Sequence, residues 1–303
     1  MVTSKEGQMF TGLSAFPLTP LADDRLDEGA FRRLVGRLAA AGVDSITALG
    51  STGSYAYLSA DERARAAAIA VDCAGDTPVF VGVGALRTSH VLNNIDAAQE
   101  AGAAGLLLAP MTYQPLCDDE VFELFRAVSE HTRLPVIVYD NPGTTHFVFS
   151  NELYGRIAQL PGIASIKIPG VPPGQQRALE HVRAIRSVLP EHVTIGVSGD
   201  ADAARGMIAG CQAWYSVIGG TLPGPALRIA RAALAGNARR AMGESDRLAP
   251  LWELFEEFGG SMRVVAAIAA ELGLVAEQCL PLPLRPLSAA QRDRVRQVLH
   301  AID

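Results

Sequence analysis

The stretch "PVFVGVGALRTSHVLNNIDAAQEAGAAGLLLA", residues 78–109, contains the pattern that decides the fold. The apolar run at 78–84 predicts a buried strand, and the amphipathic run at 88–101 predicts a helix. Gly102 then separates this helix from a second apolar run at 105–109, as expected where a helix ends before the next strand begins. The order strand, helix, glycine, strand predicts two parallel strands joined by a helix.

The same pattern recurs along most of the chain. Further apolar runs predict strands at 11–17, 45–49, 135–140, 163–168, 193–197 and 213–218, and amphipathic stretches predict helices at 28–41, 59–74, 118–132 and 173–188. Ser59, with Glu62 three residues later, predicts a capping box at the start of one helix. Eight strands that alternate with helices predict an α/β fold, a (β/α)8 TIM barrel. The alternative is a doubly wound sheet, for which the single Gly-x-Gly at 82–84 is weak support.

The last part of the chain shows no strand pattern. Helical stretches are expected near 237–258, 261–272 and 288–301, with "PLPLRP" between the last two. We therefore predict a catalytic barrel over residues 1–235 and a helical C-terminal extension, packed on the barrel, over residues 236–303.

The composition argues against several classes of protein. A net charge of −6 disfavours a nucleic-acid-binding surface, which needs clustered lysine and arginine. No uncharged apolar run reaches the roughly 18 residues that span a bilayer, and the N-terminus lacks the apolar core of a signal peptide. The four cysteines form no Cys-x-x-Cys pair, which predicts reduced thiols and a cytoplasmic protein.

Lysine is rare in this chain, because arginine supplies nearly all of the positive charge. Lys5 lies in a polar N-terminal segment, whereas Lys167 lies in the apolar run "IASIKIPG" at 163–170, where a buried strand is expected. Burial disfavours an ammonium ion, and a neutral amine can attack a carbonyl group. Lys167 is therefore a candidate Schiff-base nucleophile. The alternative is a lysine at a strand end that reaches solvent or pairs with an acid.

Other unusual residues lie at predicted strand ends, where the catalytic residues of barrel enzymes gather. Tyr139, on the strand next to that of Lys167, is a candidate proton shuttle or else a core tyrosine. In the loop "GSTGS" at 50–54, the glycines and the hydroxyls of Ser51 and Thr52 are candidates for binding a carboxylate, or else form an ordinary tight turn. The segment "SGDAD", at 198–202, is a further unusual strand end.

Together these residues resemble the dihydrodipicolinate synthase / N-acetylneuraminate lyase superfamily of class I, Schiff-base aldolases. The resemblance runs through "GLSAFPLTP" (12–20), "GSTGS", "VYDNPGTT" (138–145), "SIKIPG" (165–170) and "SGDADA" (198–203) to the helical C-terminus. It implies a (β/α)8 barrel with three C-terminal helices and a homo-oligomer, either a tetramer or a dimer. It also implies a pyruvate-type 2-oxo acid held as an imine.

The resemblance assigns a role to each candidate residue. Lys167 matches the Schiff-base lysine, and Tyr139 matches the tyrosine that relays protons. Ser51 and Thr52 match the pair that binds the substrate carboxylate, with Ser51 also in the relay. Tyr215 falls where the family offers a backbone carbonyl to the substrate.

The departures from the family concern the second substrate. Thr144 stands where dihydrodipicolinate synthases carry the arginine that binds the second substrate's carboxylate. Ile168 replaces an acid after the lysine, and Ser54 replaces a glutamate. The tyrosine that a neighbouring subunit contributes to the relay aligns with Thr112, or with Tyr113 if the register shifts by one residue.

We therefore expect a lyase that forms a Schiff base with pyruvate or a related 2-oxo acid. The expected reactions are aldol cleavage, condensation or dehydration of a 2-keto-3-deoxy-type acid. The alternatives are 4-hydroxy-tetrahydrodipicolinate synthase, which Thr144 disfavours, and a catalytically inactive barrel that binds a small acid. No cofactor is expected. His131 and His146 lack a His-x-His or His-x-x-x-Glu pattern, so no metal site is predicted.

Overall fold

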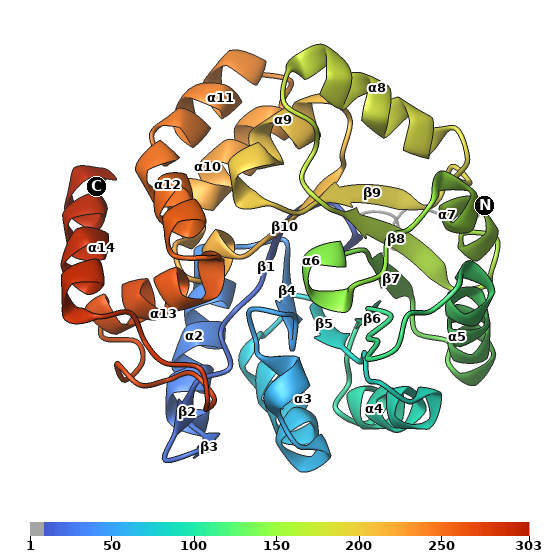
Figure 1. Ribbon diagram of the computed structural model, residues 1–303, viewed down its shortest axis with the longest axis horizontal. Helices are drawn as coiled ribbons and strands as arrows, with labels where there is room; N and C mark the ends of the chain where they lie inside the picture. Colours follow the sequence, from blue (N-terminus) through green and yellow to red (C-terminus); the bar gives the residue numbers. More distant parts are fainter. Residues whose placement is uncertain (1–8, 303) are drawn as a thin grey trace.

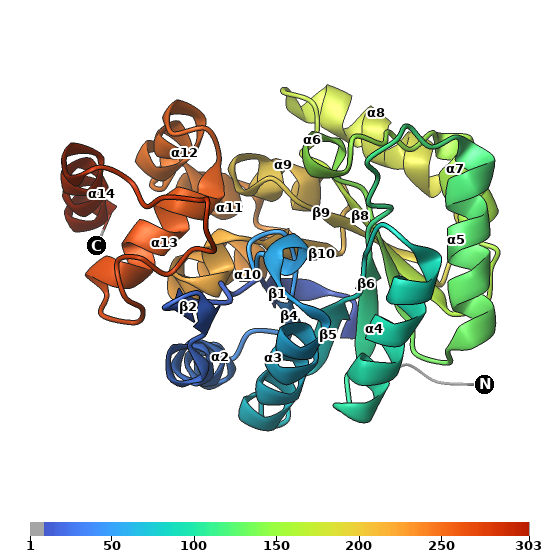
Figure 2. The ribbon, with the colours of Figure 1, turned by 60° about the horizontal axis from the view of Figure 1, so that its bottom comes forward.

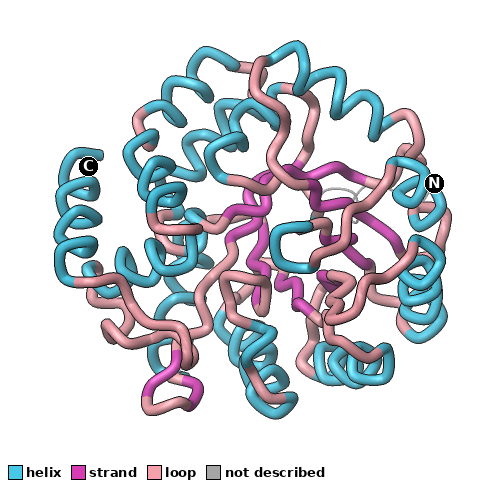
Figure 3. The backbone as a smooth tube through the Cα atoms, in the orientation of Figure 1, coloured by secondary structure: helices cyan, strands magenta, loops and turns pink. Residues whose placement is uncertain are grey.

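The computed structural model describes residues 9–302, and its centre is a closed barrel of eight parallel strands (Figure 1, Figure 3). Each strand pairs with the next and the last with the first, in the order β1 (Gly12–Ala15), β4 (Ser45–Ala48), β5 (Val79–Gly82), β6 (Gly105–Leu108), β7 (Val136–Tyr139), β8 (Ile163–Ile168), β9 (Thr194–Val197) and β10 (Ala213–Ser216). The predicted barrel is confirmed. The doubly wound alternative is wrong, because an open sheet would leave two edge strands and this sheet closes on itself.

A ring of helices surrounds the barrel (Figure 1): α2 (Glu28–Ala41), α3 (Ala60–Cys73), α4 (Thr88–Glu100), α5 (Asp118–His131), α7 (Asn151–Ile157), α8 (Gln175–Arg186), α9 (Ala203–Ile208) and α10 (Pro223–Leu234). Local signals set their ends. Ser59 and Glu62 form the predicted capping box of α3, and Gly42 ends α2 with φ of 74°, a conformation that glycine adopts without steric cost. Within residues 9–302, no helix is long and apolar enough to cross a membrane.

Strand side chains alternate between two hydrophobic cores, one between the barrel and the helices and one inside the barrel. In β7, Val138 packs outward, while Ile137 and Tyr139 fill the interior. In β8, Ile168 packs outward, so its neighbour Lys167 faces inward. The same alternation that predicts a strand therefore decides which of its residues reach the barrel interior.

Four helices follow the barrel and lie to one side of it (Figure 1, Figure 2): α11 (Ala238–Asp246), α12 (Ala249–Glu257), α13 (Ser261–Glu271) and α14 (Ala289–Ile302). The resemblance implied three C-terminal helices. The structure has four over its described residues, because the stretch 237–258, predicted as one helical stretch, divides into α11 and α12. Pro250 explains the division, because proline has no N–H to donate and fits only the first turn of a helix, here that of α12. The proposed domain boundary after residue 235 stays a prediction.

The sequence analysis gave no range for α7, α9 and α10, and it also did not predict a short hairpin and a single-turn helix. The strands β2 (Leu21–Ala22) and β3 (Arg25–Leu26) form an antiparallel hairpin, too short to show an alternating pattern. Its turn residues Asp23 and Asp24 have φ of 48° and 58°, as the favoured two-residue hairpin turn requires. The single-turn helix α6 (Pro142–Thr145) follows β7 and forms part of the rim described next.

Candidate active site

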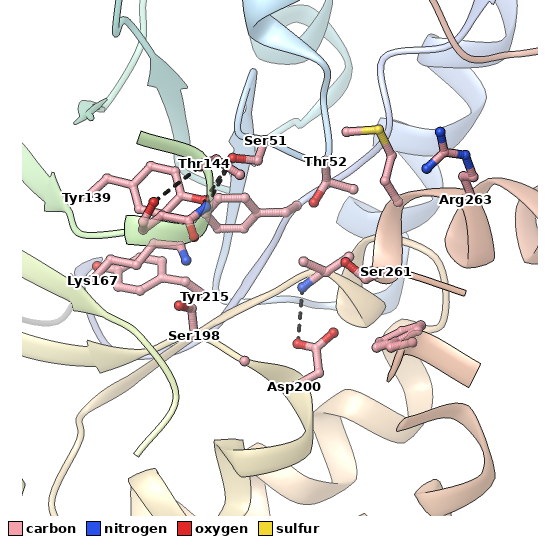
Figure 4. A pocket seen from close by; sticks show the side chains of 18 residues that line it. Ser51, Thr52, Tyr139, Thr144, Lys167, Ser198, Asp200, Tyr215, Ser261 and Arg263 are labelled. Carbon is pink, nitrogen blue, oxygen red and sulfur yellow. Dashed lines mark hydrogen bonds between the residues drawn. The ribbon is translucent and has the colours of Figure 1, made fainter. Parts of the chain in front are cut away.

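A cavity of about 420 Å³ opens at the carboxyl ends of the barrel strands (Figure 4), the end at which barrel enzymes carry their active sites. All six residues predicted to act in catalysis or substrate binding line it: Ser51, Thr52, Tyr139, Thr144, Lys167 and Tyr215. They follow or end four different strands, so barrel closure brings them together from distant parts of the chain. Their roles in catalysis stay predictions.

Lys167 is buried at the base of this site, with 4% of its surface exposed. Its Nζ lies 4.3 Å from the centroid of the Tyr139 ring and 5.4 Å from that of Phe16. Burial lowers the pKa of Lys167 to about 7, although the nearby carboxylates of Asp200 and Asp140 oppose the shift. Much of this lysine is therefore a free amine at neutral pH, the form that attacks a carbonyl. The other lysine of the chain precedes the described residues.

Tyr139 lies directly opposite Lys167 on the neighbouring strand, as the predicted strand order required. The Tyr139 hydroxyl oxygen is 2.9 Å from Ser51 Oγ, and either hydroxyl can donate in this hydrogen bond. Asn141 Nδ2 donates to the same tyrosine oxygen at 2.7 Å. Burial raises the pKa of Tyr139, so its hydroxyl is protonated at neutral pH and can donate a proton. Asn141 was not singled out in the sequence.

Thr52, Thr144 and Tyr215 complete the predicted set. Thr52 is buried in the loop after β4, whereas Thr144 is exposed on α6. The Tyr215 hydroxyl donates to Ser165 Oγ at 2.7 Å, which anchors the ring inside the barrel. That bond occupies the side chain of Tyr215 and leaves its backbone carbonyl as the group that the resemblance assigns to substrate binding.

Asp200 is a buried carboxylate in the cavity wall to which the sequence analysis assigned no role, although it marked "SGDAD" as unusual. It accepts hydrogen bonds from Trp214 Nε1 (3.0 Å), Ser216 Oγ (3.1 Å) and the backbone N–H groups of Val217 (3.2 Å) and Ile218 (2.7 Å). Burial raises the pKa of Asp200, and these four donors oppose the shift. Asp200 thus ties the end of β9 to the segment after β10.

A second buried carboxylate, Asp140, directly follows Tyr139. The Tyr154 hydroxyl donates to Asp140 Oδ2 at 2.5 Å, whereas Oδ1 is buried without a hydrogen-bond partner in the described part of the chain. Burial raises the pKa of Asp140 to about 6. The charge state of Lys167 therefore depends on two carboxylates that only the folded structure brings near it.

One wall of the cavity comes from the C-terminal extension, which the sequence analysis did not connect with the site. Phe255 of α12 and residues 259–263 line it, including the start of α13. Arg263 adds a second cationic side chain to the lining, besides Lys167. Periodicity within one sequence predicts elements but not which distant elements pack together, so no pattern pointed to this wall.

The other residues at which the sequence differs from the family pattern do not line the cavity. Ile168 packs against the helices, and Ser54 is buried at the end of its loop. The side chain of Tyr113 is 87% exposed, and Thr112 Oγ1 is buried without a hydrogen-bond partner among residues 9–302. A contribution of either residue to a neighbouring subunit stays a prediction.

The two histidines considered for a metal do not belong to a cluster of ligands among residues 9–302. His131 Nε2 lies 2.7 Å from Asp96 Oδ1 in a hydrogen bond at the surface, and His146 follows α6 as its C-terminal cap. Over the described residues, no group of three or more histidine, cysteine, aspartate or glutamate side chains is placed to hold a metal ion.

Comparisons of the sequence and of the structure with known proteins point to the same family. The profile of the Dihydrodipicolinate synthetase family matches residues 9–302. A 4-hydroxy-tetrahydrodipicolinate synthase of Thiobacillus denitrificans is 34% identical over 286 residues, 93% of each chain. The crystal structure of a dihydrodipicolinate synthase from Agrobacterium tumefaciens has a TM-score of 0.94 and 43% identity, and the match covers 99% of this chain and 100% of that one. The chloride-inhibited dihydrodipicolinate synthase of Acinetobacter baumannii, complexed with pyruvate, has a TM-score of 0.86 and 26% identity, with coverage of 97% and 99%.

Proposed function

Because this chain belongs to the Dihydrodipicolinate synthetase family and is an enzyme of the lyase class, we propose that Lys167 forms a Schiff base with pyruvate or a related 2-oxo acid. The observation that carries the proposal is a buried amine with a pKa of about 7 beside the Tyr139–Ser51 hydrogen bond. A lysine that merely reaches solvent would keep its ordinary pKa and would need no hydroxyl pair beside it.

The first step is attack of Lys167 Nζ on the C2 carbonyl carbon of the acid. Both protons of the neutral amine end on the carbonyl oxygen, which leaves as water when the C=N bond forms. Tyr139 and Ser51, hydrogen-bonded to each other, are placed to carry these protons. Once protonated, the imine withdraws electrons from C3, so a bond at C3 can break in cleavage or form in condensation.

The rest of the substrate is oriented by the cavity wall. We assign its C1 carboxylate to the hydroxyls of Ser51 and Thr52, with the Tyr215 carbonyl nearby, as in the family. The group beyond C3 then extends toward Thr144 and the C-terminal extension, which line the rest of the cavity. This part of the lining is expected to decide which aldehyde or sugar acid the enzyme accepts.

Borohydride trapping tests the proposal. Treating the enzyme with pyruvate and borohydride should add one reduced pyruvate, which peptide mass analysis should find on Lys167. The rate of trapping at saturating pyruvate should rise with pH around a midpoint near 7, because the pKa of Lys167 is lowered to about 7 and only the free amine attacks. An adduct on another residue, or a midpoint near the ordinary lysine value of 10.5, would contradict the mechanism. A barrel without imine chemistry would give no adduct at all.

A second candidate function is that of a 4-hydroxy-tetrahydrodipicolinate synthase, because the relatives from Thiobacillus denitrificans and others carry this name. These enzymes condense pyruvate with aspartate semialdehyde. Thr144 argues against it, because threonine offers one neutral hydrogen bond where an arginine offers two charge-assisted ones to a carboxylate.

We accordingly expect aspartate semialdehyde to be a poor substrate. Charge-assisted hydrogen bonds contribute about 1.5–3 kcal/mol, so kcat/KM should be about 10–100-fold below that of a synthase with arginine at the place of Thr144. The measurement is formation of cyclised product from pyruvate and aspartate semialdehyde, with pyruvate trapping as the control for an intact site. Efficient synthase activity would instead support the second candidate.

Thr144→Arg should suppress the native reaction if position 144 faces the second substrate.

The predicted homo-oligomer and the predicted cytoplasmic location are further parts of the proposal. Residues Thr112 and Tyr113 would contribute to the relay only across a subunit interface, and the exposed ring of Tyr113 is available for such a contact. Sedimentation of the purified protein would measure the number of subunits.

A further inference from the structure

Arg263 lies at the end of the cavity that the imine chemistry does not use. Figure 4 shows Lys167 and Arg263 on opposite sides of the cavity, and they are its two cationic lining residues. Under the proposed function Lys167 holds C2 of the substrate. Arg263 therefore faces the part of the substrate that extends away from the imine.

The guanidinium of Arg263 is held in place but not neutralised. Its Nε donates to the backbone carbonyl of Arg285 at 3.1 Å, which orients the plane of the group. In the described part of the chain no carboxylate forms an ion pair with it. By contrast, the arginines Arg294 and Arg296 of the same extension pair with Glu257 and Glu271.

The position of Arg263 within its helix is unfavourable for stability. It is the third residue of α13, and the first turn of that helix contains no acidic side chain. The helix dipole favours anions at this end and disfavours cations. Other arginines of the described chain, such as Arg37, also bond only to a backbone carbonyl, but Arg263 lies in the lining of the cavity. A cation at this end of the helix and in this lining is explained more readily by a ligand than by folding.

The backbone before α13 is built to bring Arg263 to the cavity wall. Gly259 and Gly260 have φ of 71° and 123°, values that side-chain-bearing residues rarely adopt. A Cβ added at either glycine would meet no atom within 4 Å, so packing does not require glycine there. Glycine is required by the backbone conformation of this turn. The turn directly precedes α13 and places the first residues of that helix in the lining of the cavity.

We propose that Arg263 binds a carboxylate at the far end of the substrate, so that the preferred substrates are 2-oxo acids with a second carboxylate group. This inference rests on the proposed function. A guanidinium can donate two parallel hydrogen bonds to one carboxylate, and the orientation set by Arg285 leaves its terminal amino groups for this purpose. Because Arg263 and Thr144 belong to different elements of the wall, Arg263 offers a carboxylate site at a different place from the family's arginine.

The test compares two six-carbon 2-keto-3-deoxy acids that differ only at the far end, one with a carboxylate and one with a hydroxymethyl group. For each acid, the concentration that gives half-maximal borohydride trapping on Lys167 is measured. In the unmodified enzyme the diacid should need about a 10–100-fold lower concentration, the range that charge-assisted hydrogen bonds provide. In Arg263→Gln the two acids should differ by less than about twofold, with Arg263→Lys in between.

Two controls make the result specific. Arg294→Gln removes an arginine of the same extension outside the cavity lining, and it should leave the preference for the diacid unchanged. Trapping of pyruvate, which has no far-end group, should be the same in all variants, and this shows that each has folded. An acid with a far-end phosphate completes the series, and tighter trapping of the phosphate than of the carboxylate would overturn the assignment of a carboxylate.

The inference fails if the unmodified enzyme traps both acids equally well, or if Arg263→Gln keeps the preference for the diacid. If the unmodified enzyme traps none of the acids, pyruvate included, the imine proposal itself is overturned. Calorimetric titration of the unreduced enzyme with the same two acids then decides whether Arg263 binds the carboxylate.

Discussion

Replacing Lys167 by methionine is expected to reduce turnover of the best 2-oxo acid substrate by a factor on the order of 10⁶, the scale seen when an enzyme loses its covalent nucleophile. Methionine is similar in length and suits the apolar surroundings, but it forms no imine. The measurement is kcat with pyruvate release or consumption as the readout. Borohydride should add nothing to position 167 of the variant. Residual turnover above about one per cent would contradict the assignment.

Stability provides the control for this substitution. The pKa of Lys167 is lowered from 10.5 to about 7 in the folded protein, so between these values the unfolded chain binds more protons at this site. The contribution of Lys167 therefore makes the free energy of unfolding of the unmodified protein increase as pH rises from 7 to 10.5. Lys167→Met lacks this dependence. It should melt at a higher temperature than the unmodified protein near pH 6, and the difference should shrink toward pH 10.

Tyr139→Phe should fold normally and lose about 10²–10⁴-fold in kcat, the usual contribution of general acid–base catalysis. The change removes the hydroxyl that contacts Ser51 Oγ but keeps the ring beside Lys167 Nζ. Both formation of the imine and the later proton transfers are expected to slow. Trapping of pyruvate on Lys167 should still occur, given longer reaction times.

Tyr55→Phe is a matched control for Tyr139→Phe. Tyr55 is also a buried tyrosine, and burial together with the nearby Tyr139 raises its pKa. It is not in the cavity lining, it has no contact with Lys167 among the ring contacts of the described residues, and Arg63 lies over its ring at 5.5 Å. Loss of its hydroxyl should leave kcat within about twofold, the range of a substitution outside the reacting groups. If both variants lose turnover equally, Tyr139 is a core tyrosine rather than a proton shuttle.

Much of the fold was predictable from the sequence because strands and helices are local patterns. The strand at 163–168 and the helix at 28–41 have the predicted bounds in the structure. The ends of the other strands differ from the predicted ends by at most two residues. Pro250, a visible signal, explains why 237–258 became two helices. The hairpin of β2 and β3 was missed because two residues are too few to show a period.

The sequence by itself determined the order of strands and helices, and it singled out Lys167 as a rare lysine in an apolar strand. Barrel closure then placed Tyr139 opposite it, as neighbouring strands in chain order require. Only the tertiary structure decided the pKa of Lys167, the hydrogen bonds of Asp200 and the position of Arg263 in the cavity wall. These properties depend on desolvation and on contacts between segments far apart in the chain, and neither has a period that one sequence can reveal.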